Sequence, residues 1–385
     1  MSFTGKATYS AGSSLPESAE DVSDLVGIVS PFETPLLDVL GDAARAARST
    51  VHEWLEDTLN PNQDTVNQSS FGNPSTDTTV VVSNVGRFAV GDQIRLDGGT
   101  EVMLVTAINT GSSQLTITRG YGATTATALS DGATIDIIGN ASLEGDDAAP
   151  AVFTDRVRKS NYTQIFASTV DVSGSELAVR QIGVADELDY QKQNRLRELM
   201  RDLENSVING RAPTANQQGS NTVRRTMNGV LAFIATNKFS PGVSGFPSDT
   251  ALTEAQLNLA LRSIWQQSSG NVDLIVVGGK EKRAMNQFMS SWRRTSPADQ
   301  TFANQIAVYD SDFGTCKIVL SRYVPTGTVL LLDSSRVEVM PLGGRSFHYK
   351  PLAATGDGVS GQVLGEYTLE FRNENAHGVI SGLTT

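Results

Sequence analysis

The chain has 385 residues, of which 39% are hydrophobic and 19% charged, as is ordinary for a globular protein that can bury a sizeable core. Its length suggests two or three domains at roughly 150 residues per domain. The formal net charge of −12 argues against tight DNA binding as the main activity, because a protein that grips phosphates normally presents a basic face. A role in solubility alone would also explain the negative net charge.

The single cysteine, Cys316, excludes an intrachain disulfide. It lies in a strand-like run, 316–320, where we expect a buried and unreactive thiol. The amino-terminal sequence MSFTGKATYSAGSS lacks the charged and then apolar pattern of an export signal. No run approaches the ~18 apolar residues that a membrane-spanning helix needs, so we expect no membrane association.

Small, polar and acidic residues fill positions 1–24, which predicts an extended arm. Thr34-Pro35 then places a capping residue before a proline, as in the first turn of a helix. A short apolar patch follows and stops at Gly41, which predicts a short helix; its members are Leu36, Leu37, Val39 and Leu40. Residues 51–75 are polar and turn-rich, and we expect them to form the outgoing limb of a long extended loop.

Short β-rich runs, separated by turn residues, recur at roughly ten-residue spacing between positions 78 and 139. The runs are 78–82, 93–96, 102–105, 114–118 and 134–138. Gly98-Gly99 and Gly111-Ser112-Ser113 are hairpin signals. The pattern predicts a compact β insertion of about sixty residues, a size at which a domain is just able to fold by itself.

A basic cluster, Arg156-Val157-Arg158-Lys159, precedes a strand-like run at 162–166. The cluster has two interpretations. A solvated strand face is the favoured one, and contact with an acidic neighbour is the other.

The strongest helix signal lies at 183–209, where apolar residues recur at intervals of four and three: Leu188, Leu196, Leu199, Leu203 and Val207. Asp189 and Lys192 interrupt this stripe, so we expect its first half to be only partly covered. Arg197 and Arg201 are like charges four residues apart, which is mildly unfavourable in isolation. They either have partners elsewhere or, more simply, lie on a solvated face.

The remaining chain alternates helices and strands. Thr253-Glu254-Ala255-Gln256 is a capping box that opens a helix, 273–277 is a continuous apolar run typical of a buried strand, and 280–290 is again helical. Further strands are expected at 317–324, 328–332, 336–340, 346–352, 362–371 and 378–383. This order predicts a mixed α/β layer.

Motifs that carry chemistry are weak. None of the three histidines has a second histidine at metal-ligand spacing, so no metal site is expected. Gly356–Gly361 matches GxGxxG, but a strand and not a helix is expected after it, so we interpret it as a loop. Asp312-Phe313-Gly314 lacks the accompanying kinase motifs, and Asp310 with Asp312 lacks the other ligands of a calcium loop. We therefore expect no catalytic, cofactor-binding or metal site, and no enzyme.

Several blocks together are similar to a known family. They are 361–383 (GQVLGEYTLEFRNENAHGVISGL), Tyr309–Gly314 with the strands up to Pro325, Ser30–Gly41, and Thr118–Gly122. In their order and spacing they resemble the major capsid proteins of tailed bacteriophages with the Hong Kong 97-type fold, in the branch with a β insertion. The resemblance spans most of the chain and implies an α+β capsid fold.

The resemblance also implies a domain map. It places an amino-terminal arm at 1–50, an extended loop at 51–165 with the β insertion at 77–140, a peripheral domain at 166–225 and 339–385 with a spine helix at 183–209, and an axial domain at 226–338. Neighbouring subunits would then cover the long helix and the loop. No removable scaffolding region is expected.

The implied function is a structural subunit that self-assembles into pentamers and hexamers of an icosahedral head around double-stranded DNA, without sequence-specific DNA binding. The implied location is the virion, after assembly in the host bacterial cytoplasm. Portal, scaffolding and decoration proteins are candidate partners besides other copies. The expected intersubunit contacts are Phe32, Leu36 and Leu37 in the arm, and Arg156, Arg158, Lys159, Arg197 and Arg201 facing acidic groups.

An alternative is a phage decoration or tail-associated binding protein that uses the β insertion to recognise a receptor. Size-exclusion chromatography separates the two, because a fibre protein should be a trimer and a capsid protein should give rings or very large particles. An enzyme with scattered site residues is a third class, which turnover in generic substrate assays would favour.

Overall fold

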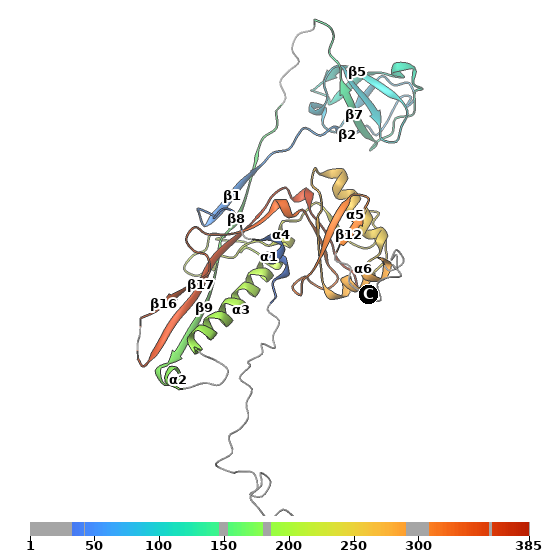
Figure 1. Ribbon diagram of the computed structural model, residues 1–385. Coiled ribbons are helices and arrows are strands. Elements are labelled where there is room, and N and C mark those ends of the chain that lie inside the picture. Colours follow the sequence, from blue (N-terminus) through green and yellow to red (C-terminus); the bar gives the residue numbers. More distant parts are fainter. Residues whose placement is uncertain are drawn as a thin grey trace, which may run out of the picture. The chain divides into compact units, whose positions relative to one another are not determined.

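The computed structural model describes residues 33–41, 43–145, 153–179, 186–289, 308–353 and 356–384. The chain splits into two compact units, Leu55–Val157 and the combination of Met1–Trp54 with Arg158–Thr385. Figure 1 shows the strands of each unit. Each unit is described below by itself.

The smaller unit is a closed β-barrel. Its strands β2 (Gln63–Thr65), β3 (Thr79–Val81), β4 (Asp92–Leu96), β5 (Val102–Asn109), β6 (Gln114–Thr118) and β7 (Thr134–Asn140) pair antiparallel in the order β2-β7-β4-β5-β6-β3. An antiparallel bridge between Val66 and Val82 joins the two ends of this order. Closure leaves no open strand edge, which is the usual protection against edge-to-edge aggregation.

Alternating side chains fill the barrel. The burial pattern of β6 alternates, with Leu115 and Ile117 inside, as expected for a strand with one wet face. Val66, Ile94, Met103 and Ile135 belong to the same core. Residues 63–66 therefore form part of the barrel and not of the outgoing limb that the sequence predicted. Strand β2 has three residues, none of them apolar, and only Val66 after it enters the core, so the segment is too short to give a periodic signal.

The larger unit contains a mixed sheet of six strands, β10-β18-β14-β11-β13-β12. The strands are β10 (Lys238–Phe239), β11 (Leu274–Val277), β12 (Val308–Ser311), β13 (Gly314–Leu320), β14 (Val329–Leu332) and β18 (Gly378–Ile380). Helices α5 (Glu254–Gln267) and α6 (Gly279–Met289) contribute to a core that includes Leu257, Leu261, Met285 and one side of the sheet. The predicted capping box of Thr253 and Gln256 is present at the start of α5.

An antiparallel sheet forms the rest of the larger unit. The long strand β17 (Gly358–Phe371) pairs with β15 (Val337–Pro341), β16 (His348–Pro351) and β9 (Gln164–Ser173). The predicted long helix, α3 (Glu187–Asn209), packs against β9 (Figure 1), and residues 183–185 lie outside the described residues. Short helices α1 (Pro35–Leu40), α2 (Gly174–Ala178) and α4 (Val230–Phe233) complete the unit. Strands β1 (Val51–Glu56) and β8 (Val157–Tyr162) pair as a two-stranded ribbon.

Two details differ from the sequence interpretation. Strand β18 was expected within the peripheral segment 339–385, but it pairs with β14 and β10 in the mixed sheet. The end of the GxGxxG match, Gly358–Gly361, belongs to β17 and not to a loop, because it continues the ladder with β9. In both cases the pairing partner is distant in sequence.

Candidate intersubunit contact surfaces

The arm enters the larger unit at helix α1. Thr34 caps this helix by position, but its side chain makes no capping hydrogen bond. The carboxylate of Glu204 on α3 replaces it, and Oε2 accepts from the backbone N–H groups of Leu36 at 3.2 Å and Leu37 at 3.5 Å. Free N–H groups at a helix start need such an acceptor.

The predicted arm residues lie as follows. Leu36 is fully buried in the core of its own subunit, so its side chain is not free to contact a neighbour. Leu37 packs against the same core but stays half-buried. Phe32 lies outside the described residues.

Glu204 is itself fully buried on α3. Its Oε1 accepts a hydrogen bond of 2.8 Å from the Ser321 hydroxyl at the end of β13. Burial raises the pKa of this carboxyl group. One side chain thus connects the arm, the long helix and the mixed sheet.

The basic cluster of 156–159 lies at the base of the extended loop. Arg158 Nη1 lies 3.4 Å from Glu53 Oε2, and Arg156 Nε lies 3.6 Å from Asp57 Oδ2. Both arginine side chains remain about 70% exposed, at 68% for Arg158 and 71% for Arg156, and Lys159 is exposed as well. Exposed ion pairs of this kind contribute only about 0–1 kcal/mol, so these cations stay available to other partners.

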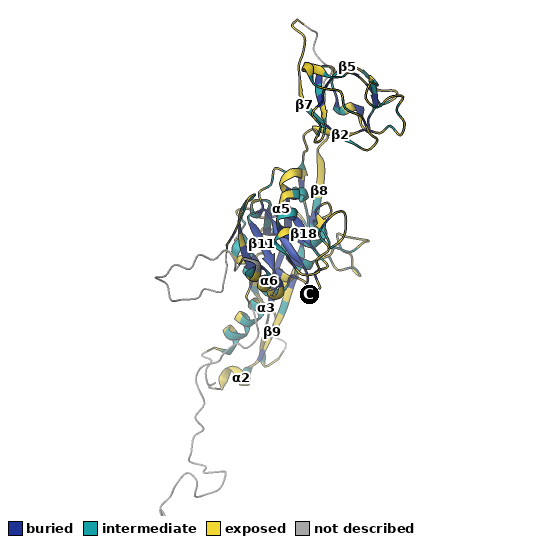
Figure 2. Cartoon of the chain, turned by 90° about the vertical axis from the view of Figure 1, so that its right-hand side faces the viewer, coloured by how far each residue is buried: buried dark blue, intermediate teal, exposed yellow. Residues whose placement is uncertain are grey.

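The two limbs of the loop carry large apolar side chains that the chain itself leaves in solvent. The exposed members are Leu55, Leu59, Leu143, Phe153 and Val157. Leu59 is 93% exposed and Phe153 is 81% exposed. Figure 2 shows the exposed stretches in yellow. Large apolar side chains that are exposed together on one segment are candidates for interaction sites in soluble proteins.

The long helix is covered only over its second half. No residue from Glu187 to Glu198 is buried, whereas Leu199, Leu203, Val207 and Ile208 are. Arg197 and Arg201 are both half-buried; Arg197 Nη1 lies 3.4 Å from Asn194 Oδ1, and Arg201 Nε lies 3.7 Å from Asp202 Oδ1. The partial cover expected from Asp189 and Lys192 is confirmed.

Two buried carboxylates on β17 hold the base of the loop and the arm. Glu370 Oε2 lies 2.5 Å from His52 Nε2, and its Oε1 lies 2.8 Å from Arg45 Nη2. Burial opposes ionisation of Glu370, but the hydrogen bond to His52 and the charge of Arg45 outweigh it and lower the pKa. The arm segment that follows α1 and the start of β1 are therefore both bound to the same strand.

The second carboxylate, Glu366, accepts from the Thr163 hydroxyl and from Arg225 Nη2, both at 2.6 Å, and pairs with Arg345 Nε at 2.8 Å. Thr163 follows β8, so this cluster fixes the returning strand of the ribbon. The ribbon is thus anchored at its base by both of its strands.

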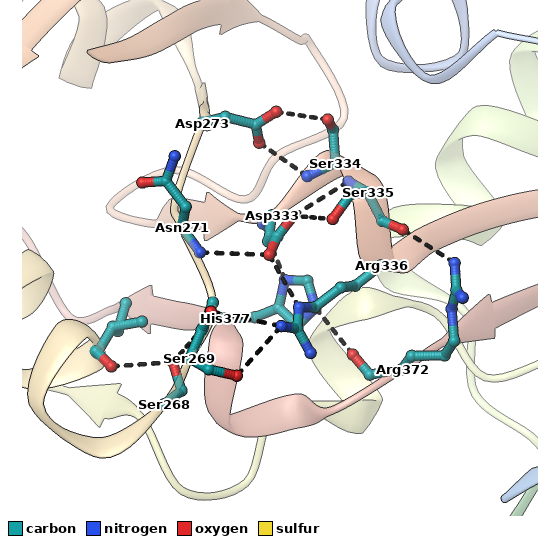
Figure 3. A network of polar contacts seen from close by, with 12 residues as sticks. Ser268, Ser269, Asn271, Asp273, Asp333, Ser334, Ser335, Arg336, Arg372 and His377 are labelled. Carbon is teal, nitrogen blue, oxygen red and sulfur yellow. Dashed lines mark hydrogen bonds and ion pairs between the residues drawn. The ribbon is translucent and has the colours of Figure 1, made fainter. Parts of the chain in front are cut away.

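Two of the connections between the two sheets are short, one through η4 (Ser334–Arg336) after β14 and one through η5 (Glu374–Ala376) before β18. A polar network joins these crossings (Figure 3). Asp333 accepts from the Ser335 hydroxyl at 2.5 Å and from Arg336 Nε at 2.9 Å. Burial opposes its ionisation, but these hydrogen bonds lower the pKa of Asp333.

His377 lies at the centre of this network and is fully buried. Its Nδ1 accepts from the Asp333 N–H at 3.2 Å, and its Nε2–H donates to the Arg372 carbonyl oxygen at 3.3 Å. Burial lowers the pKa of His377 from 6.5 to about 4, so the ring is neutral near pH 7. Its contacts are those of a structural link between the two sheets.

The other chemistry-bearing residues have structural positions. Cys316 is buried, its thiol donates to the Val272 carbonyl oxygen at 3.1 Å, and burial raises its pKa to about 12. Phe313 of the β12–β13 turn stacks near Trp265, with ring centroids 5.9 Å apart. Across the described parts of the chain, no group of three His, Cys, Asp or Glu side chains could hold a metal ion. Within these parts no helix has the length and apolar character needed to span a bilayer.

Sequence reasoning missed the polar residues that organise these surfaces. Glu204, Glu370 and His377 each interrupt an apolar pattern, between buried neighbours such as Leu203 and Val207 in the case of Glu204. A charged residue within a buried stripe is the available signal, because such a group is retained only with partners. The identity of those partners, 44 to more than 300 residues away, is not visible in the sequence.

Comparison with known proteins identifies the family. Residues 3–384 match the family described as SU10 major capsid protein. No curated protein matches the sequence. The structure is similar to the capsid of a native GTA particle, with a TM-score of 0.50 and 11% identity over 99% of this chain and 100% of that chain.

Further solved structures are less similar. The Mycobacterium phage Bobi structure has a TM-score of 0.42 and 13% identity over 82% of this chain and 87% of that one. The holo-SrpI encapsulin complex from Synechococcus elongatus PCC 7942 has a TM-score of 0.43 and 13% identity over 60% and 78%. The predicted relationship to phage major capsid proteins and the α+β capsid fold are confirmed. The family match, which spans almost the entire chain, shows that this protein belongs to the SU10 major capsid protein family.

Proposed function

We propose that copies of this chain assemble into pentamers and hexamers of an icosahedral shell that encloses double-stranded DNA. This proposal rests on the solvent-exposed apolar side chains of the loop limbs, above all Leu59 and Phe153. Fully burying each such side chain is worth about 1.5–3 kcal/mol. The limbs therefore gain free energy when another molecule covers these side chains.

The contacts in such a shell are head-to-tail. The limbs and the partly covered half of α3 are different surfaces, so each subunit can offer one to a neighbour and receive the other. Heterologous contacts of this type close into rings when the rotation between neighbours permits. Many modest contacts per subunit then add up to a stable particle.

The predicted contact residues fit this scheme in different ways. Arg156, Arg158 and Lys159 would meet acidic groups of a neighbour, and Arg197 with Arg201 would do so on α3. In the arm, Phe32 and Leu37 are the remaining candidates, since Leu36 is enclosed by its own subunit.

The domain roles follow the family scheme with adjusted limits. The arm would run to about residue 50 and the loop from 51 to 165, with its inserted barrel beginning near Gln63. The antiparallel sheet with α3 would be the peripheral domain, and the mixed sheet, including β18, the axial domain. The net charge of −12 suits an inner wall that does not adhere to DNA. Assembly in the bacterial cytoplasm, with portal, scaffolding or decoration proteins as further partners, belongs to the same proposal.

The test removes the apolar surface. A subunit with Leu59→Asp and Phe153→Asp should fold with an unchanged circular dichroism spectrum but yield at least about tenfold fewer shells by negative-stain microscopy, because each lost contact costs a kilocalorie or more. Asn60→Asp adds charge to the same limb without removing apolar surface and should assemble normally. Normal shell yield from the double variant would overturn the proposal.

A further inference from the structure

A groove of about 920 Å³ opens beside the arm on the larger unit. Its basic wall is formed by Arg45, Arg48 and His52, and its apolar floor is Leu342, which is half-buried, above the buried side chains of Ala47 and Met340. The arm is paired with the segment after β15 there, because the Ala47 N–H donates to the Pro341 carbonyl oxygen at 2.9 Å and the Gly343 N–H donates to the Ala47 carbonyl oxygen at 2.9 Å. Both walls of the groove thus belong to this unit.

The basic side chains of the groove differ in how many acidic partners they have. Arg45 is paired with Glu338 at 2.9 Å and Glu370 at 2.8 Å, and His52 is paired with Glu370. Arg48 is exposed and forms no hydrogen bond or ion pair with residues that the structure describes. The groove thus combines one uncommitted cation with an apolar floor, which fits an apolar side chain followed by a carboxylate.

The other compact unit carries that combination. Residues 55–157 contain 13 Asp and Glu against 4 Arg and no Lys, and therefore a charge of −9 out of the chain's −12. On the limb that leads back from the barrel, Leu143 is 78% exposed and Glu144 beside it is exposed. The sequence continues with Gly145-Asp146-Asp147.

We propose that the groove at Arg48 binds the returning limb of a second copy, with Leu143 on the apolar floor and Glu144 paired with Arg48. The contact rests on the proposed shell function and specifies one of its interfaces. Groove and limb are different surfaces on different units, so the contact is head-to-tail and can repeat around a ring. Charge complementarity of this kind sets the partner and the register more than the affinity.

Charge reversal tests the pairing. Arg48→Glu and Glu144→Arg should each lower shell yield by about tenfold or more, because like charges then face each other. The double variant should recover most of the wild-type yield. A mismatched double variant, Lys350→Glu with Glu144→Arg, has the same net charge and should stay defective.

A mixing experiment identifies the occupant. When Arg48→Glu subunits are combined with Glu144→Arg subunits, every groove has a limb of opposite charge available on the other kind of subunit. A second copy as occupant predicts that the mixture recovers six-membered rings and part of the shell yield although neither variant does so alone; a five-membered ring keeps at least one mismatched contact. Circular dichroism of each variant establishes that it is folded.

Four outcomes would overturn the proposal. If the double variant is no better than the worse single variant, Arg48 and Glu144 do not pair. If the double variant recovers but the mixture does not, the limb of the same chain occupies the groove. If Arg48→Glu alone is defective and Glu144→Arg assembles normally, another acidic segment, such as residues 17–24, is the occupant, and if both single variants assemble normally, the groove is not an interface. Failure of the wild-type chain to form shells would instead contradict the proposed function.

Discussion

The link between the two sheets should weaken in mild acid, because it depends on a neutral histidine. Protonation of His377 would turn Nδ1 into a donor that faces the Asp333 N–H, itself a donor. The fully buried ring would then carry a charge beside the cation of Arg336, and burial outweighs the support from the Arg372 carbonyl oxygen and from the carboxylates of Asp333 and Glu374. Acidification should therefore favour unfolding.

The size of the effect follows from the pKa difference. His377 has a pKa of about 4 in the folded chain and an ordinary value of 6.5 when unfolded, so the unfolded state binds the proton first as the pH falls. Stability is fully present above pH 6.5 and decreases down to pH 4. At about 1.4 kcal/mol per pKa unit the total is about 3 kcal/mol, of which about 2 kcal/mol is lost between pH 7.5 and pH 5.

Urea unfolding of dissociated subunits, followed by tryptophan fluorescence at several pH values, measures this loss. The acids of the network, Asp333 and Glu374, have lowered pKa values and lose their contribution only below their ordinary range near pH 4, outside this window. His377→Asn keeps a short polar side chain without a titrating ring and should remove the pH dependence attributed to this site. The reasoning is refuted if wild type and variant lose the same stability between pH 7.5 and pH 5.

Two further predictions concern buried ion and hydrogen-bond partners. In the barrel, Glu101 is buried, and its carboxylate accepts a hydrogen bond of 2.7 Å from Arg119 Nε. Burial opposes ionisation of Glu101, but this hydrogen bond and others lower its pKa to about 2. Arg119→Met would leave this buried charge without its partner and should destabilise the barrel by about 3–5 kcal/mol in thermal unfolding. An unchanged melting transition would contradict this role, and Glu101→Gln with Arg119→Met should be less damaging than Arg119→Met alone. In the arm, Glu204→Leu should speed hydrogen exchange at Leu36 and Leu37 by about tenfold or more, because a buried N–H without an acceptor costs about 1–3 kcal/mol. Glu204→Gln retains an acceptor oxygen and should stay near wild type; equal exchange in both variants would show that Glu204 does not hold the arm.

Local patterns in the sequence predicted the elements that are stabilised locally. The stripe of α3 is an example, since Leu199, Leu203 and Val207 are the residues that it buries. The capping box at Thr253 is another, because both of its hydrogen bonds lie within four residues. The apolar run at 273–277 correctly predicted a buried strand, because all four residues of β11 are buried.

Features that depend on distant pairing were not predictable in this way. β2 became part of the barrel only through its ladder with β7, seventy residues later. β18 reaches the mixed sheet because of the crossing at η5. The groove beside Arg48 is assembled from the arm and from the segment after β15, and neither part signals a binding surface alone.

The most direct measurement is electron microscopy of the purified protein at high concentration, together with its sedimentation. If neighbouring subunits cover the exposed apolar side chains of the loop limbs, we expect closed particles of very high mass. In these particles Leu59 and Phe153 should be protected from reagents that label solvent-exposed side chains. A single species of one-chain mass, with both side chains still accessible at the highest concentration, would contradict the account.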